Sequence, residues 1–226
     1  MFERLKKAFS SAAPSAPQTV AAATSRLSEW AGTQGLGYSS KPGTGFMLEG
    51  KIAGRPWRME CGKPSRDFIR GEELRARAEM GVRDDAAVLV MNRPLKDALE
   101  KRAYAMFTDS LQTIADPHLP EEMRWLSMYD EVGWESAPPD FWKYYSVLAD
   151  RKEDASAWLS DRLVRSLLAW PLPNPETPFV LMVLRGKLYL RMEYAKPDTP
   201  TLEHAVKVFT LACEDANAGL TTDLSI

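Results

Sequence analysis

Two arginines of this chain, Arg75 and Arg77, have the type and the spacing to bind an anion together. Residues 72–82 alternate between apolar and polar side chains, which is typical of a β-strand, so both guanidinium groups point to the same face. The planar guanidinium group suits bidentate contacts with carboxylates and phosphates. The pair therefore indicates a surface for an acidic ligand or an acidic protein. The alternative is that both arginines form cross-strand ion pairs on a solvated sheet face.

Trp57 is the aromatic residue that could accompany these arginines. A deep pocket lined by Trp57, Arg75 and Arg77 would indicate a small anionic ligand, whereas a flat or ion-paired arginine face would disfavour one. RNA binding needs several aromatic side chains on which bases stack, and Trp57 has little else nearby. Because the formal net charge is also only −2, we expect no nucleic-acid partner.

A second candidate surface is the aromatic and acidic segment 125–145, which contains seven aromatic side chains. Aromatic side chains bring a large contact area at a low entropic cost, so they suit a protein-binding or sugar-binding surface. Most of them should instead fill the core. We expect Trp134 to be the exposed member, because it precedes the loop that contains Pro138 and Pro139.

Residues for common catalytic and metal chemistry are scarce in this sequence. His118 and His204 are the two histidines, and no nucleotide-binding or hydrolase motif occurs. Adjacent acidic pairs such as 84–85 and 153–154 are typical of surface turns and helix starts, and they lack the spacing of a calcium loop. Cys61 and Cys213 are expected to be reduced core thiols. We therefore expect no metal, no cofactor and no catalytic residue.

The composition is that of a globular protein with a sizeable core: 226 residues, of which 45% are hydrophobic and 27% charged. No apolar run reaches the roughly 20 residues of a transmembrane helix. We expect residues 1–18 to be a disordered tail and the location to be cytoplasmic. The alternative is that the tail contacts a membrane surface, because Phe2, Leu5 and Phe9 lie at helical spacing beside basic residues.

Residues 19–226 are predicted to form one α+β domain, mainly an antiparallel sheet with about four packed helices. Helices are expected at 20–30, 92–114, 153–170 and 199–219. Hairpins are expected at 46–62, at 72–91 and at 179–194, and further strands at 123–129 and 141–149. The turn-rich residues 116–120 separate possible halves at 19–116 and 121–220.

An internal repeat would explain two halves. Sliding the chain by 133 positions aligns residues 46–64 with 179–197, with seven identities. The alternative is that two hairpins share an F-x-L opening and an R-M-E ending by pattern alone.

The sequence therefore favours a non-catalytic intracellular binding or adaptor protein. The alternative is a protein that binds a small anionic ligand, or an enzyme with a carboxylate and arginine site. Residues 51–102 hold 13 basic and 9 acidic groups, whereas residues 103–226 hold 11 basic and 19 acidic groups. The two parts of the chain thus have net charges of opposite sign, which permits a homo-oligomer without requiring one.

Overall fold

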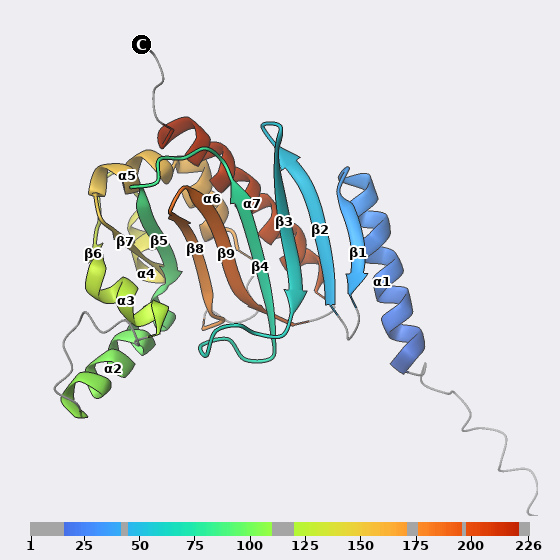
Figure 1. Ribbon diagram of the computed structural model, residues 1–226, viewed down its shortest axis with the longest axis horizontal. Helices are drawn as coiled ribbons and strands as arrows, with labels where there is room; N and C mark the ends of the chain where they lie inside the picture. Colours follow the sequence, from blue (N-terminus) through green and yellow to red (C-terminus); the bar gives the residue numbers. More distant parts are fainter. Residues whose placement is uncertain (1–15, 42–44, 110–119, 171–175, 196–197, 222–226) are drawn as a thin grey trace, which may run out of the picture.

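A single nine-stranded sheet organises the structure, a computed structural model that describes residues 16–41, 45–109, 120–170, 176–195 and 198–221 (Figure 1). The strands are β1 (Gly37–Lys41), β2 (Gly45–Ile52), β3 (Arg55–Gly62), β4 (Glu72–Glu79), β5 (Ala87–Asn92), β6 (Asp130–Glu131), β7 (Tyr145–Ala149), β8 (Phe179–Leu184) and β9 (Lys187–Tyr194). Their order is β1-β2-β3-β4-β9-β8-β5-β7-β6, and every pairing between these strands is antiparallel.

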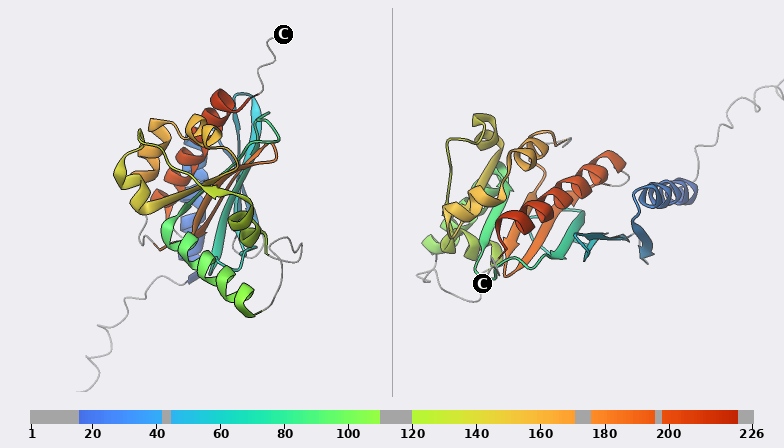
Figure 2. Two further views of the ribbon diagram at one scale, coloured as in Figure 1. Left: turned by 90° about the vertical axis from the view of Figure 1, so that its left-hand side faces the viewer. Right: turned by 90° about the horizontal axis from the view of Figure 1, so that it is seen from above.

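Seven helices occur among the described residues: α1 (Ala16–Thr33), α2 (Arg93–Asp109), α3 (Glu121–Met128), α4 (Pro139–Tyr144), α5 (Lys152–Trp158), α6 (Asp161–Leu168) and α7 (Thr199–Gly219). The larger core lies between the sheet and the helices α1 and α4–α7. On the opposite face, α2 and α3 cover only β5, β7 and β8, where they form a smaller core (Figure 2). The α+β class is therefore confirmed, whereas the expected number of about four helices is too low.

The two halves of the sheet differ in how they are covered, and this difference explains their sequences. All six residues of β5 are buried, because helices pack on both of its faces. In β4 the core side chains Leu74, Ala76 and Ala78 alternate with Arg75 and Arg77, because helices cover only one face there. One face of the β2-β3-β4-β9 region is therefore left without helices.

The predicted hairpin over residues 72–91 is wrong, although both strands exist. β9 and β8 lie between β4 and β5 in the sheet, so the connection at residues 80–86 crosses over rather than turning back. A strand with two apolar faces, such as β5, is stable where helices cover both faces. The hairpin at 179–194 is confirmed, and Arg185 and Gly186 have the positive φ of a tight hairpin turn.

Two other sequence predictions are corrected. Residues 121–128 form a helix instead of a strand, because the buried positions Glu122, Met123 and Trp125 follow helical spacing after Pro120. The predicted strand at 141–149 is split, since residues 139–144 are helical and the strand begins at Tyr145. The predicted helix at 153–170 is two helices, and Ser160 caps the second by accepting from the backbone N–H of Leu163 at 3.3 Å.

The structure can be compared with the predicted tail, the two predicted halves and the internal repeat. Of the predicted tail, residues 1–15 lie outside the described residues, and residues 16–18 belong to α1. The two proposed halves contribute interleaved strands, since β9 and β8 lie between β4 and β5. The internal repeat stays a prediction. The two hairpins continue differently, since β3 leads into the strand β4 whereas β9 leads into the helix α7. Among the described helices, none has the length and apolar character to cross a membrane.

Candidate functional site

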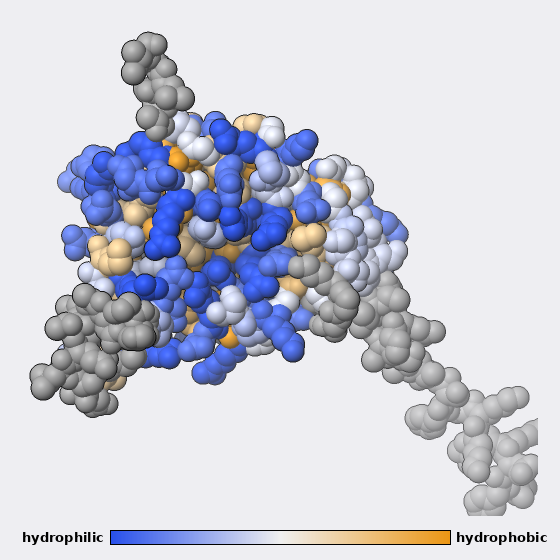
Figure 3. All heavy atoms as spheres, in the orientation of Figure 1, coloured by the Kyte–Doolittle hydropathy of each residue, from blue (hydrophilic) through white to orange (hydrophobic). Residues whose placement is uncertain are grey.

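The uncovered region of the sheet presents a charged surface, which we call the open face. It is made by the side chains on this face of β3, β4 and β9, which are Arg58, Glu60, Glu73, Arg75, Arg77, Glu79, Lys187, Tyr189, Arg191 and Glu193. Figure 3 shows hydrophilic residues dominating the surface over these strands. The register aligns the side chains in rows across the strands, so each has a defined neighbour on the next strand.

Arg75 and Arg77 lie on the open face and point the same way, as their spacing predicts. Arg75 Nε donates to Glu60 Oε1 at 2.7 Å, and its NH1 lies 3.5 Å from Glu73 Oε2. Arg77 NH2 donates to Glu79 Oε1 at 2.6 Å, and this hydrogen bond lowers the pKa of Glu79. Arg75 is therefore held between two carboxylates, whereas Arg77 keeps 42% of its side-chain surface exposed.

Glu73 is the centre of the ion-paired part of the open face. Its side chain is fully buried and accepts hydrogen bonds from Ser65 N at 2.7 Å, from Ser65 Oγ at 2.8 Å and from Arg191 NH1. Arg191 also donates to Ser65 Oγ at 2.8 Å. These contacts fix the β3–β4 connection against β9, so this carboxylate has a structural role.

In the remaining row of the open face, two arginines lie opposite each other on neighbouring strands. Arg58 lies directly opposite Arg77, and Tyr189 of β9 follows in the same row. Arg58 is exposed and has no ion-pair partner among the described residues, although Glu49 lies opposite it on β2. Sequence reasoning did not single out Arg58 or Tyr189. The alternation of Arg58 with the buried Trp57 and Met59 was the available signal.

Trp57 does not belong to this surface. Its side chain is 4% exposed and lies on the other face of the sheet, where its ring centroid is 5.9 Å from that of Phe209. Trp134 is half-buried, and its ring contacts that of Trp142 edge-on at 5.0 Å in the region between β6 and α4. The fold thus brings Arg75 and Arg77 together but separates them from both tryptophans.

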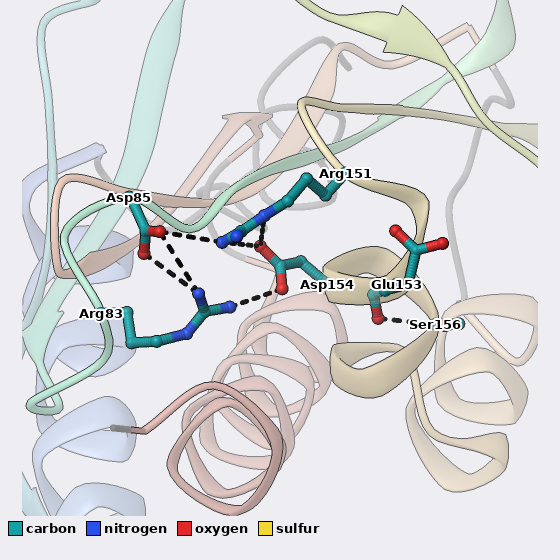
Figure 4. Close-up of polar contacts among 6 residues, drawn as sticks. All are labelled: Arg83, Asp85, Arg151, Glu153, Asp154 and Ser156. Atoms are coloured by element: carbon teal, nitrogen blue, oxygen red, sulfur yellow. Dashed lines mark hydrogen bonds and ion pairs between the residues drawn. The ribbon is translucent and has the colours of Figure 1, made fainter. Parts of the chain in front are cut away.

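A second group of arginines and carboxylates, which we call the ion cluster, joins the β4–β5 connection to α5 (Figure 4). Arg83 donates to Asp85 Oδ1 at 3.1 Å and to Asp154, and Arg151 donates to Asp154 Oδ2 at 3.1 Å and to Asp85 Oδ2 at 3.0 Å. Glu153 points away from these four residues in Figure 4. Each charged group has two partners of opposite charge, so the ion cluster fastens two segments distant in sequence.

Groups for redox or metal chemistry are buried or dispersed. Cys61 and Cys213 are both buried and unbonded to each other, as expected, and burial raises the pKa of the Cys213 thiol. His204 Nε2 lies 2.8 Å from the carbonyl oxygen of Ser166, and burial lowers the pKa of this imidazole. Within the described ranges, no three His, Cys, Asp or Glu side chains are gathered as metal ligands.

Comparison with known proteins gives information on the fold. The sequence matches no family model and no curated protein. The structure is similar to the crystal structure of the mycobacterial trehalose monomycolate transport factor A, TtfA, with a TM-score of 0.51. The similarity covers 88% of this chain and 97% of that chain at 10% sequence identity. At this identity the similarity concerns the fold alone.

Proposed function

We propose that this chain is a non-catalytic binding protein that docks an acidic segment of a partner protein on its open face. The observation that carries the proposal is the juxtaposition of Arg58 and Arg77 on adjacent strands. Like charges directly opposite each other on paired strands are destabilising. A partner carboxylate placed between the two guanidinium groups would relieve this repulsion and form charge-assisted hydrogen bonds with both.

The surroundings of these two arginines suit a protein partner. Tyr189 lies beside Arg77 in the row, and tyrosine and arginine are both enriched in protein interfaces. The sheet hydrogen bonds fix the backbone of β3, β4 and β9, so little backbone ordering is required on binding. Two cavities of about 420 Å³ occur in the described part of the chain, and no arginine lines either of them, so neither encloses a site at Arg58 and Arg77.

The alternative of a carboxylate and arginine active site has less support, because the carboxylates of the ion cluster and Glu73 are already occupied by arginines.

The test is capture of partners by the tagged full chain from a lysate of its source cells. We compare the unaltered protein with the double variant Arg58→Glu/Arg77→Glu and with the control Arg165→Glu, an exposed residue on α6 across the sheet. We expect a protein that the unaltered chain and the control retain, that the double variant loses, and whose retention falls as salt rises. Equal thermal melts show that all three are folded. Identical captured sets, or no captured protein, would overturn the proposal.

A further inference from the structure

A cavity of about 420 Å³ lies away from the open face, where β5 ends and α2 begins. Its lining combines Asn92 and Pro94 with Lys143 and Tyr144 of α4 and with Leu168 and Trp170 at the end of α6. The volume falls within the range of about 300–1,000 Å³ that is usual for small-molecule sites. The open face and the proposed partner play no part in it.

The cavity wall is fixed by buried hydrogen bonds. Tyr145 Oη donates to the carbonyl oxygen of Leu167 at 2.8 Å and so joins β7 to α6. The backbone N–H of Phe179 donates to Asn92 Oδ1 at 2.9 Å and so joins β8 to the end of β5. Because these contacts are internal to the protein, the cavity is formed before any ligand arrives.

The lining is apolar and aromatic, and one aromatic side chain is left open to solvent. Tyr144 is 55% exposed, one of three large hydrophobic residues that the described structure exposes. Leu168 is half-buried and Trp170 is 9% exposed. Apolar surface that the fold leaves accessible inside a concave site favours a ligand with an apolar body.

The polar groups of the lining favour an anion. No carboxylate of the described residues lines the cavity, and Lys143 supplies its positive charge. The Lys143 ammonium group pairs with Asp140 at 2.7 Å, but both side chains are mostly exposed, so the pair is weak and Lys143 can turn to a ligand. The first turn of α2 adds the positive end of a helix dipole.

We propose that this cavity binds a small organic anion with an apolar body, such as a medium-chain carboxylate or an aromatic sulfonate. The apolar body packs against Tyr144, Leu168 and Trp170. The anionic group pairs with Lys143.

The test uses the fluorescent anion 8-anilinonaphthalene-1-sulfonate on the full chain, with decanoate as competitor below its micellar concentration. We expect saturable binding that decanoate displaces and that decyltrimethylammonium, of the same chain length but positive charge, does not. Lys143→Glu should weaken probe binding about tenfold, and Leu168→Trp should abolish it by filling the cavity. The matched control Lys152→Glu, an exposed lysine on α5, should bind like the unaltered chain.

A second measurement locates the bound anion. The indole N–H signal of Trp170, assigned with Trp170→Phe, should shift on addition of decanoate in a two-dimensional nitrogen–proton NMR spectrum. Equal affinities of Lys143→Glu and Lys152→Glu would overturn the proposal, as would equal displacement by the cation or an unmoved Trp170 signal. These outcomes are independent of partner capture on the open face.

Discussion

Replacing Glu73 by glutamine tests whether the open face depends on one buried carboxylate. The substitution keeps the shape of the side chain and removes its charge. Glu73 is fully buried and receives two hydrogen bonds from Ser65 and one from Arg191. Glutamine can accept with only one oxygen, so one of these donors loses its partner.

The expected loss of stability follows from what remains around Arg191. This side chain is 18% exposed, and its Nε is buried without a partner, so it depends on Glu73 for charge balance. Removing one member of a buried ion pair costs about 3–5 kcal/mol. Because Arg191 keeps the Ser65 hydroxyl and some contact with water, we expect the lower end, about 3 kcal/mol. With a urea m-value of about 3 kcal/mol per molar, the midpoint would fall by about 1 M.

The assay is urea unfolding followed by tryptophan fluorescence, with Glu79→Gln as the matched control. Glu79 lies on the same strand and the same face and also pairs with an arginine, but it is 60% exposed. Its loss should change the midpoint far less, because exposed ion pairs contribute little.

Equal midpoints for Glu73→Gln and Glu79→Gln would refute the reasoning. The double variant Glu73→Gln/Arg191→Met provides a further check. It removes both charges, so it should recover most of the stability that Glu73→Gln loses. If the two substitutions instead lower the free energy of unfolding additively, so that the double variant is less stable than Glu73→Gln, charge balance is not the cause.

Two further predictions concern pH and packing. Burial lowers the pKa of His204 below its ordinary value of about 6.5. The folded protein therefore binds a proton at this residue less readily than the unfolded protein does. The free energy of unfolding should accordingly be highest above pH 6.5 and decline as the pH falls below it. Thermal melts between pH 8 and pH 5 should show a smaller decline for His204→Asn, and an unchanged decline would contradict this. At the end of α7, a Cβ on Gly219 would lie 2.5 Å from the carbonyl oxygen of Ala157, whereas a Cβ on Gly32 in α1 meets nothing within 4 Å. Gly219→Ala should therefore lower the melting temperature and Gly32→Ala should raise it, and melts shifted in the same direction would refute the packing argument.

The sequence by itself determined those features that depend only on residues close together along the chain. The alternation of residues 72–79 placed Arg75 and Arg77 on one face, and residues 185–186 specified the tight turn between β8 and β9. These signals are local, because a strand has a side-chain period of two and a tight turn requires particular backbone angles. The strand predicted at residues 123–129 was wrong, because the alternation of polar and apolar residues over so short a segment also fits a short helix, here Glu121–Met128.

The tertiary structure alone decided which strands became neighbours. It inserted β9 and β8 between β4 and β5, and this order brought Arg191 to Glu73 and Tyr189 to the row of Arg58 and Arg77. Strand order depends on which strands are covered on both faces, and this is a property of the whole core rather than of a segment. The position of Trp57 on the opposite face from the arginines follows from the same register.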